Sequence, residues 1–121
     1  MRPEGFPRRL RVSRRRDFLR IQRTGRKLHT RHFMVFVLVH RERDAAAEPG
    51  RLGITVTRRV ANAVGRNRIK RIVREAFRRE RARMRPGFDL VWVAKREAAS
   101  ATFAQVVQQM RDIADQIAIE R

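Results

Sequence analysis

The chain has no cysteine, and it contains no apolar run that approaches the length of a membrane span. The missing cysteines exclude disulfides, zinc–thiolate sites and a cysteine nucleophile. The N-terminal residues also lack the apolar core of a secretory signal. We therefore expect a cytoplasmic protein that has no membrane partner.

Acidic residues are scarce and scattered: 12 Asp and Glu stand against 31 Lys and Arg. There is no glycine-rich phosphate loop and no pattern typical of a Ser–His–Asp triad. The three histidines, His29, His32 and His40, have neither a helical ligand spacing nor an acidic cluster beside them. The sequence therefore predicts no catalytic residue and no metal site in this chain.

Positive charge is what the sequence has in excess. The formal net charge is +19, and 28 of the 31 cations are arginines. A compact protein with this charge repels itself unless a polyanion is its usual partner. Arginine also offers a planar fork that makes paired contacts to phosphate, although genomic composition can produce the same bias.

The most informative stretch is a basic amphipathic helix that begins near Asn62, a good N-cap residue. Its apolar residues recur at the spacing of one buried helical face: Ile69, Ile72, Val73, Ala76, Phe77 and Met84. The opposite side carries Asn67, Arg71, Arg74, Arg78 and Arg85, with Lys70 and Arg81 on the flank. A solvated face normally mixes both signs, whereas only Glu75 and Glu80 are acidic here. This face is therefore interpreted as a polyanion-binding surface.

The remaining pattern predicts a single domain over residues 1–121, of class α+β, with helices packed on a small sheet in the order α-β-β-α-β-α. Residues 1–12 are expected to form a flexible basic arm. Ser13 is expected to cap a helix that runs to Thr24 and stops at Gly25. The segments that follow are predicted to be a basic loop at 26–31, strands at 32–40, 51–57 and 88–94, and a last helix capped by Ser100 or Thr102. The second strand is expected to run antiparallel to the first.

Two phenylalanines have alternative interpretations. Phe18 lies on the thin apolar side of the first helix, where a core role is favoured. Phe36 shares one strand face with Met34 and Leu38, while Phe33, Val35, Val37 and Val39 share the other. Because both faces are apolar, either both are covered or one lines a groove.

The order of residues in the basic helix resembles a known signature. Arg66-Asn67-Arg68-Ile69-Lys70-Arg71, preceded by Ala61-Asn62-Ala63-Val64-Gly65, is similar to the signature helix of the protein subunit of bacterial ribonuclease P. The lead-in Thr57-Arg58-Arg59-Val60 also matches, and a weaker resemblance extends from about Leu10 to the last helix. The resemblance implies that the basic helix joins two neighbouring parallel strands by a left-handed crossover, an exception to a strong rule.

The family resemblance also implies a function. In bacterial ribonuclease P the RNA subunit is the catalyst, and it uses Mg²⁺, held mainly by RNA, to remove the 5′ leader from precursor tRNA. The small basic protein binds the catalytic RNA and the single-stranded leader, and it requires no protein partner. We therefore expect this chain to be a subunit of an endoribonuclease whose active site lies in the RNA.

Site residues follow from the same resemblance. The surface that meets the catalytic RNA would contain Arg66, Asn67, Arg68 and Arg71, supported by Arg58, Arg59 and Asn62. The groove that holds the leader would be lined by Phe18, Phe36, Lys70 and Arg74. Where the family often has a second aromatic residue one turn beyond Phe18, this chain has Gln22, which can offer a hydrogen bond to a base edge instead.

A ribosomal or nucleoid protein that coats nucleic acid would explain the charge equally well. It would not explain the Arg66-Asn67-Arg68 motif together with Phe18 and Phe36. A stand-alone nuclease is disfavoured by the shortage of acids.

Overall fold

The computed structural model describes residues 8–39, 50–84 and 87–119. Its class is α+β, and the predicted order of major elements is confirmed with one additional strand. The elements are η1 (Arg8–Leu10), α1 (Arg15–Thr24), β1 (Arg26–His29), β2 (Phe33–Val39), β3 (Arg51–Thr55), α3 (Ala63–Glu80), η2 (Arg81–Arg83), β4 (Phe88–Ala94), η3 (Arg96–Ser100) and α4 (Phe103–Ile119).

The four strands form one mixed sheet in the order β1-β2-β4-β3. β2 pairs antiparallel with β1 and with β4, whereas β3 pairs parallel with β4. The strands β2 and β3 do run in opposite directions, as expected, but β4 lies between them. The basic helix α3 joins the neighbouring parallel strands β3 and β4, which agrees with the family expectation; its left-handedness stays a prediction.

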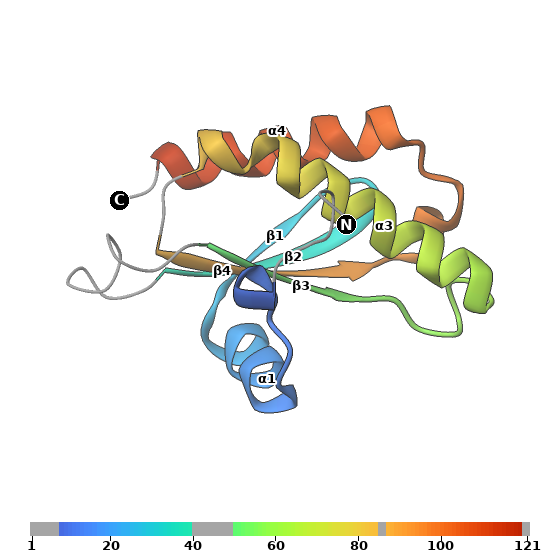
Figure 1. Ribbon diagram of the computed structural model, residues 1–121, viewed down its shortest axis with the longest axis horizontal. Helices are drawn as coiled ribbons and strands as arrows, with labels where there is room; N and C mark the ends of the chain where they lie inside the picture. The colour runs from blue at the N-terminus through green and yellow to red at the C-terminus, as the bar shows by residue number, and fades with distance from the viewer. Residues whose placement is uncertain (1–7, 40–49, 85–86, 120–121) are drawn as a thin grey trace.

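The sheet is covered on both faces (Figure 1). Helices α3 and α4 lie across one face, and α1 lies against the other. The larger core, between the sheet and α3 and α4, includes Phe33, Val73, Phe77, Leu90 and Trp92, all without measurable exposure. A smaller core under α1 contains Val12, Ile21, Phe36 and Val91. Period two along β2 thus separates its residues into two cores, as the two apolar faces predicted.

Residues 26–31 were expected to be a loop, and that expectation is wrong for β1. Arg26 pairs with Val37 and His29 with Met34. Charged residues are poor predictors of a strand, but here the backbone of the apolar strand β2 supplies the hydrogen-bonding partner. The residues of β1 carry no strand signal of their own, because the strand is defined by pairing with β2, whose partner residues lie five to eleven positions further along the chain.

The prediction of a flexible basic arm is wrong for residues 8–12, which pack against the sheet. Leu10 and Val12 are 3% and 4% exposed, and the Val12 amide donates to the Leu52 carbonyl at 3.0 Å. Residues 1–7 of that predicted arm lie outside the described residues. The prediction that Ser13 caps the first helix is also wrong. Val12 is bonded to β3, and the N-cap residue of α1 is Arg14, whose side chain makes no capping hydrogen bond.

Gly25 ends α1 as predicted, but not by a left-handed conformation, since its φ is −78°. A Cβ at this position would lie 2.5 Å from the Ile21 carbonyl oxygen and 2.9 Å from that of Val37. Glycine is therefore required by close approach of α1 to the first residues of the sheet. At α4, the cap is Thr102: its hydroxyl accepts from the Gln105 amide at 3.2 Å, and the Gln105 side chain accepts from the Thr102 amide at 2.9 Å.

An ion pair joins the two helices on the large core. The Arg111 guanidinium of α4 donates from Nε and Nη2 to the two carboxylate oxygens of Glu80, at 3.2 and 3.1 Å, at the end of α3. Glu80 is only 5% exposed. The bond from Arg111 outweighs burial and lowers the pKa of Glu80 below its ordinary value of 4.5.

We expect Glu80→Gln to lower the free energy of unfolding at pH 7, because it removes the charged partner of Arg111. A depressed carboxyl pKa contributes stability above the unfolded-state pKa, and that contribution is lost as the pH falls through the folded-state pKa. The deficit relative to wild type should therefore shrink on acidification below pH 4.5. Urea denaturation of both proteins across this range, with the exposed Glu97→Gln as control, measures it. A deficit that stays constant with pH would contradict the assignment.

Candidate nucleic-acid interface

The predicted RNA-binding residues lie together at the beginning of α3. Asn62 caps the helix, since its side-chain oxygen accepts from the Gly65 amide at 2.9 Å. Arg58 and Arg59 are exposed in the turn just before it, and Asn67, Arg68 and Arg71 are exposed within the first three turns. The structure therefore brings together every member of the predicted set: Arg58, Arg59, Asn62, Arg66, Asn67, Arg68 and Arg71.

Two arginines of the signature are partly committed to the protein itself. Arg66 donates from Nη1 to the Ala61 carbonyl oxygen at 3.1 Å, and Arg68 donates from Nη2 to that of Ala101 at 2.9 Å. Each guanidinium has five N–H donors, so most remain available to a ligand. These backbone bonds hold two flexible side chains in place, which lowers the entropy cost of a phosphate contact.

Acid partners divide α3 into two halves. In the C-terminal half, Glu75 forms ion pairs with Arg78 and Arg79, and Glu80 with Arg83 and Arg111. Among the described residues, no acidic side chain forms an ion pair with the cations of the turn and of the part of α3 that precedes Glu75: Arg58, Arg59, Arg66, Arg68, Lys70, Arg71 and Arg74. Within α3 and the turn before it, the charges without acid partners therefore lie on the N-terminal side of Glu75.

A groove opens beside this cationic end. One hollow of about 220 Å³ is lined by Phe18 of α1, Gly53 of β3, and Lys70 and Arg74 of α3, together with the segment Arg11-Val12-Ser13 and the flanking Leu52 and Ile54. A second hollow of about 400 Å³ shares Ser13 and Phe18 and adds Arg15, Leu19, Gln22 and Thr55. We call the two together the α1–β3 groove.

The groove forms at the edge of the sheet, where α1 from one face and α3 from the other both reach β3. Phe18 rests on Gly53: a Cβ there would lie 2.7 Å from the Phe18 ring and 3.0 Å from Cβ of Val12. Burial, and then the charge of Arg11, lower the pKa of Arg74 from its ordinary value. Two like charges therefore face a common space, and an anion between them would relieve their repulsion.

Three of the four predicted groove residues meet there: Phe18, Lys70 and Arg74. Phe36 lines neither of these two hollows, so its place in the leader groove stays a prediction. It lies on β2, with β4 between it and β3, and it is 9% exposed in the small core with Val12, Ile21 and Val91. The Lys27 ammonium lies 5.9 Å from the centre of its ring.

Sequence reasoning missed Gly53, Arg11 and the clamp that holds α1 in place. In that clamp Arg51 of β3 donates to both carboxylate oxygens of the fully buried Asp89 of β4, at 2.9 and 2.8 Å. The same guanidinium lies 3.8 Å from Asp17 in the first turn of α1. The isolated Gly53 within an apolar strand was an available signal, since such a glycine often marks a close approach.

Two further observations concern the described residues. No three His, Cys, Asp or Glu side chains within them gather as a set able to hold a metal ion. No helix among them is both long enough and apolar enough to cross a bilayer.

The fold and this site define the class: a small, strongly basic α+β protein whose crossover helix presents cations beside a groove. The model of the Ribonuclease P family matches residues 6–118. A ribonuclease P protein component from Oleidesulfovibrio alaskensis is 41% identical over 116 residues, covering 91% of this chain and 90% of that protein. The chain belongs to the ribonuclease P protein family.

Solved structures agree with this assignment. The ribonuclease P protein from Thermotoga maritima superposes with a TM-score of 0.76 at 32% identity, covering 88% of this chain and 96% of that one. The protein from Staphylococcus aureus gives a TM-score of 0.74 at 29% identity, covering 90% and 94%. The similarity therefore includes the sheet and the helices on both its faces.

Truncation of Phe36 tests its assignment to the small core. We expect Phe36→Ala to lower the free energy of unfolding by about 3–5 kcal/mol, because it empties a packed site under α1. Val39→Ala, which truncates a 64% exposed apolar residue of the same strand, should stay within about 0.5 kcal/mol of wild type. If denaturant titrations show that both variants lose equally little free energy of unfolding, the core assignment is wrong and the groove assignment of Phe36 is favoured.

Proposed function

We propose that this chain is the RNA-binding subunit that assists a catalytic ribonuclease P RNA in removing the 5′ leader from precursor tRNA. The α1–β3 groove beside the cations of α3 is the observation that carries the proposal. One continuous surface then serves two RNA segments: the structured catalytic RNA and an unpaired leader.

The catalytic RNA would meet the N-terminal end of α3 and the turn before it. Arg58, Arg59 and Arg71 are exposed there and have no acidic partner within the described part of the chain, so they are available to neutralise phosphates. Arg66 and Arg68 are already held by backbone carbonyls, which suits them to defined contacts with a folded RNA. Family membership supports this partner, and no protein partner is required.

The leader would occupy the α1–β3 groove. Surfaces for single-stranded nucleic acid combine a cationic track with an aromatic platform. Lys70 and Arg74 supply the track, and the half-buried ring of Phe18 supplies the platform. Gln22, in the adjoining hollow, is placed to bond a base edge where the family often has an aromatic residue.

Cleavage itself would belong to the RNA. Mg²⁺ takes hard oxygen ligands, and no acidic set of the required kind occurs among the described residues. In this proposal RNA phosphates hold the metal, and the protein binds, orients and neutralises charge. Its site of action is the cytoplasm.

The proposal is tested directly by leader release. A bacterial ribonuclease P RNA is mixed with precursor tRNA at low Mg²⁺, with and without this protein. We expect cleavage at the mature 5′ end only when the RNA is present, and faster with the protein than without it. Cleavage by nuclease-free protein alone, or no stimulation of the RNA, would contradict the proposal; RNA binding without stimulation would favour a protein that merely coats nucleic acid.

Binding to the catalytic RNA should depend strongly on salt. If six to ten phosphates are neutralised, affinity falls by about 10³–10⁵-fold between 50 and 200 mM salt, because bound counterions are released. Filter-binding titrations over this range give the slope. A nearly flat dependence would show that the cations of α3 are not the main contact.

Phe18→Ala should reduce discrimination between precursor and mature tRNA. The two RNAs differ by the leader, and loss of one base stack weakens precursor binding to the holoenzyme by about 1–3 kcal/mol. Mature tRNA should bind as before. Val39→Ala, an apolar truncation outside the groove, serves as control, and melting curves verify the fold. An unchanged ratio of the two affinities in a folded Phe18→Ala protein would remove this residue from the leader site.

A further inference from the structure

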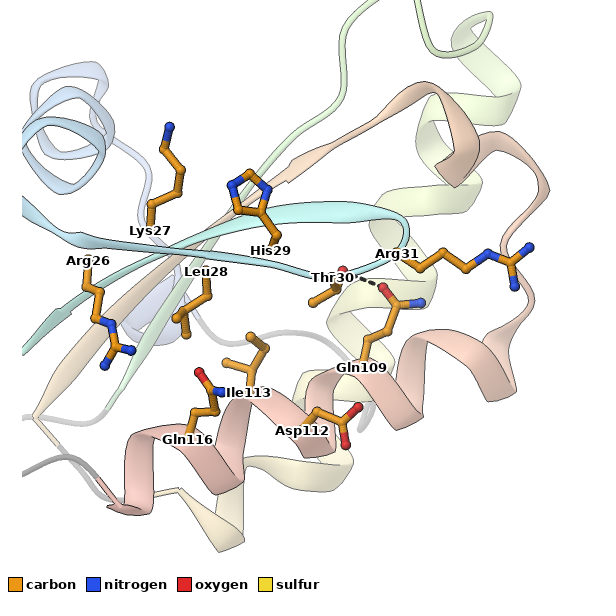
Figure 2. A pocket seen from close by; sticks show the side chains of 10 residues that line it. All are labelled: Arg26, Lys27, Leu28, His29, Thr30, Arg31, Gln109, Asp112, Ile113 and Gln116. Atoms are coloured by element: carbon orange, nitrogen blue, oxygen red, sulfur yellow. Dashed lines mark hydrogen bonds between the residues drawn. The ribbon is translucent and has the colours of Figure 1, made fainter.

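A third hollow lies on the other edge of the sheet, far from the α1–β3 groove in the strand order. It has a volume of about 450 Å³ and lies between β1 and α4, and we call it the β1–α4 cleft (Figure 2). The strand side is formed by residues 26–31, and the helix side by Gln109, Asp112, Ile113 and Gln116. No part of the function proposed above uses these residues.

The cleft has an apolar floor and polar walls. Figure 2 shows Leu28 of β1 and Ile113 of α4 facing each other, with Arg26 on the same side of the strand as Leu28 and near Gln116. Lys27 and His29 point away from α4, as period two along a strand requires. The floor is thus apolar, with Leu28 half-buried and Ile113 3% exposed, and the surrounding side chains offer charge and hydrogen bonds.

One wall is held in a defined position. Gln109 is 8% exposed, and its side chain bonds the Thr30 hydroxyl, the His32 amide at 3.2 Å and the His32 ring Nδ1 at 2.6 Å. Lys95 also donates to the Thr30 carbonyl oxygen at 2.7 Å. The turn between β1 and β2 is therefore tied to α4, so the cleft does not depend on a loose loop.

The charges favour a polyanion over another protein strand. Arg26 and Arg31 line the strand side, and Asp112 is the only acid among the lining residues. Cations along an edge strand disfavour addition of a second strand, above all from another copy with a net charge of +19. The same cations attract phosphates.

An unpaired nucleotide matches the remaining chemistry. Single-stranded RNA is bound by contact with the faces of its bases and by hydrogen bonds to their edges. Leu28 and Ile113 provide the apolar surface that the face of a base would contact. At the wall, the Gln116 amide can donate and accept hydrogen bonds, and the Asp112 carboxylate can accept them. Arg26 and Arg31 lie at the two ends of the strand side, where the phosphate backbone of the RNA segment would enter and leave the cleft.

We propose that the β1–α4 cleft binds an unpaired segment of the catalytic RNA, as a second contact separate from α3. This rests on the function proposed above. The catalytic RNA is the chosen source because β2 and β4 separate β1 from β3, so the leader groove and this cleft lie on opposite edges of the sheet. A large folded RNA spans both edges more readily than one leader strand does.

The test compares two isosteric substitutions on α4. Gln116→Glu places a negative charge in the cleft, where it repels phosphate. Gln105→Glu makes the same charge change outside the cleft, and its carboxylate still accepts from the Thr102 amide in the capping arrangement. Binding to catalytic RNA alone is measured at low salt, with melting curves for both variants.

We expect Gln116→Glu to weaken binding about fivefold or more, the effect of one like charge near contact distance in water, and Gln105→Glu to change it little. Arg31→Gln should also reduce the slope of log affinity against log salt by about 0.7, the loss of one single-strand phosphate contact. Leader-dependent discrimination by the Gln116→Glu holoenzyme should stay at the wild-type ratio.

The outcomes separate the two proposals. If wild type does not bind the RNA, the proposed function fails. If wild type binds and both glutamate variants bind equally well or equally poorly, the cleft is not an RNA site. Loss of precursor discrimination with unchanged binding to catalytic RNA would assign the cleft to the leader instead, and self-association that Gln116→Glu abolishes would make it a contact between copies; either result overturns the proposal.

Discussion

The parallel pairing of β3 with β4 is the constraint on which the rest of the structure depends. Parallel neighbours need a long crossover, and here that crossover is α3. To return the chain to the sheet, α3 must pack one face against the large core, so its other face is presented to solvent along its whole length. The middle of α3, at Lys70 and Arg74, then lies beside the edge strand β3, which α1 also reaches from the opposite face. The α1–β3 groove is the result.

Few acids are available to offset the charge, and the structure uses them where elements meet. Asp89 is fully buried under Arg51, which also approaches Asp17, so one guanidinium connects β3, β4 and α1. Glu80 connects the end of α3 to Arg111 of α4. Acids placed at these joints stabilise the scaffold locally. Among the described residues they leave the cations of α3 that precede Glu75 without acidic partners, and a polyanion bound there would relieve the repulsion between them.

Features encoded over a few residues were predictable from the sequence. The Asn62 cap, the apolar stripe of α3 and the end of α1 at Gly25 all depend on neighbours within one or two helical turns. The placement of β4 between β2 and β3 was missed because it depends on pairing between distant segments. The strand β1 was missed because its own residues are mostly basic, and only pairing with the apolar strand β2 defines it. For Phe36 the alternating pattern of β2 allowed both a core and a groove, and only the position of its strand in the sheet decides between them. Phe18, Lys70 and Arg74 were grouped by family resemblance. Their common hollow also includes Gly53; the sequence offered this glycine as a mark of a close approach, but only the structure shows that Phe18 of α1 is what approaches it.

The central claim is that α1 and α3 together form one site for the unpaired leader at the β3 edge. Photochemical cross-linking from a reactive base in the leader of precursor tRNA, within the assembled complex, tests it most directly. The account predicts cross-linked peptides from residues 11–22 and from residues 66–74. These cross-links should be absent when mature tRNA, which has no leader, is added in place of the precursor. Cross-links confined to β1 and α4, with none to α1, would contradict it.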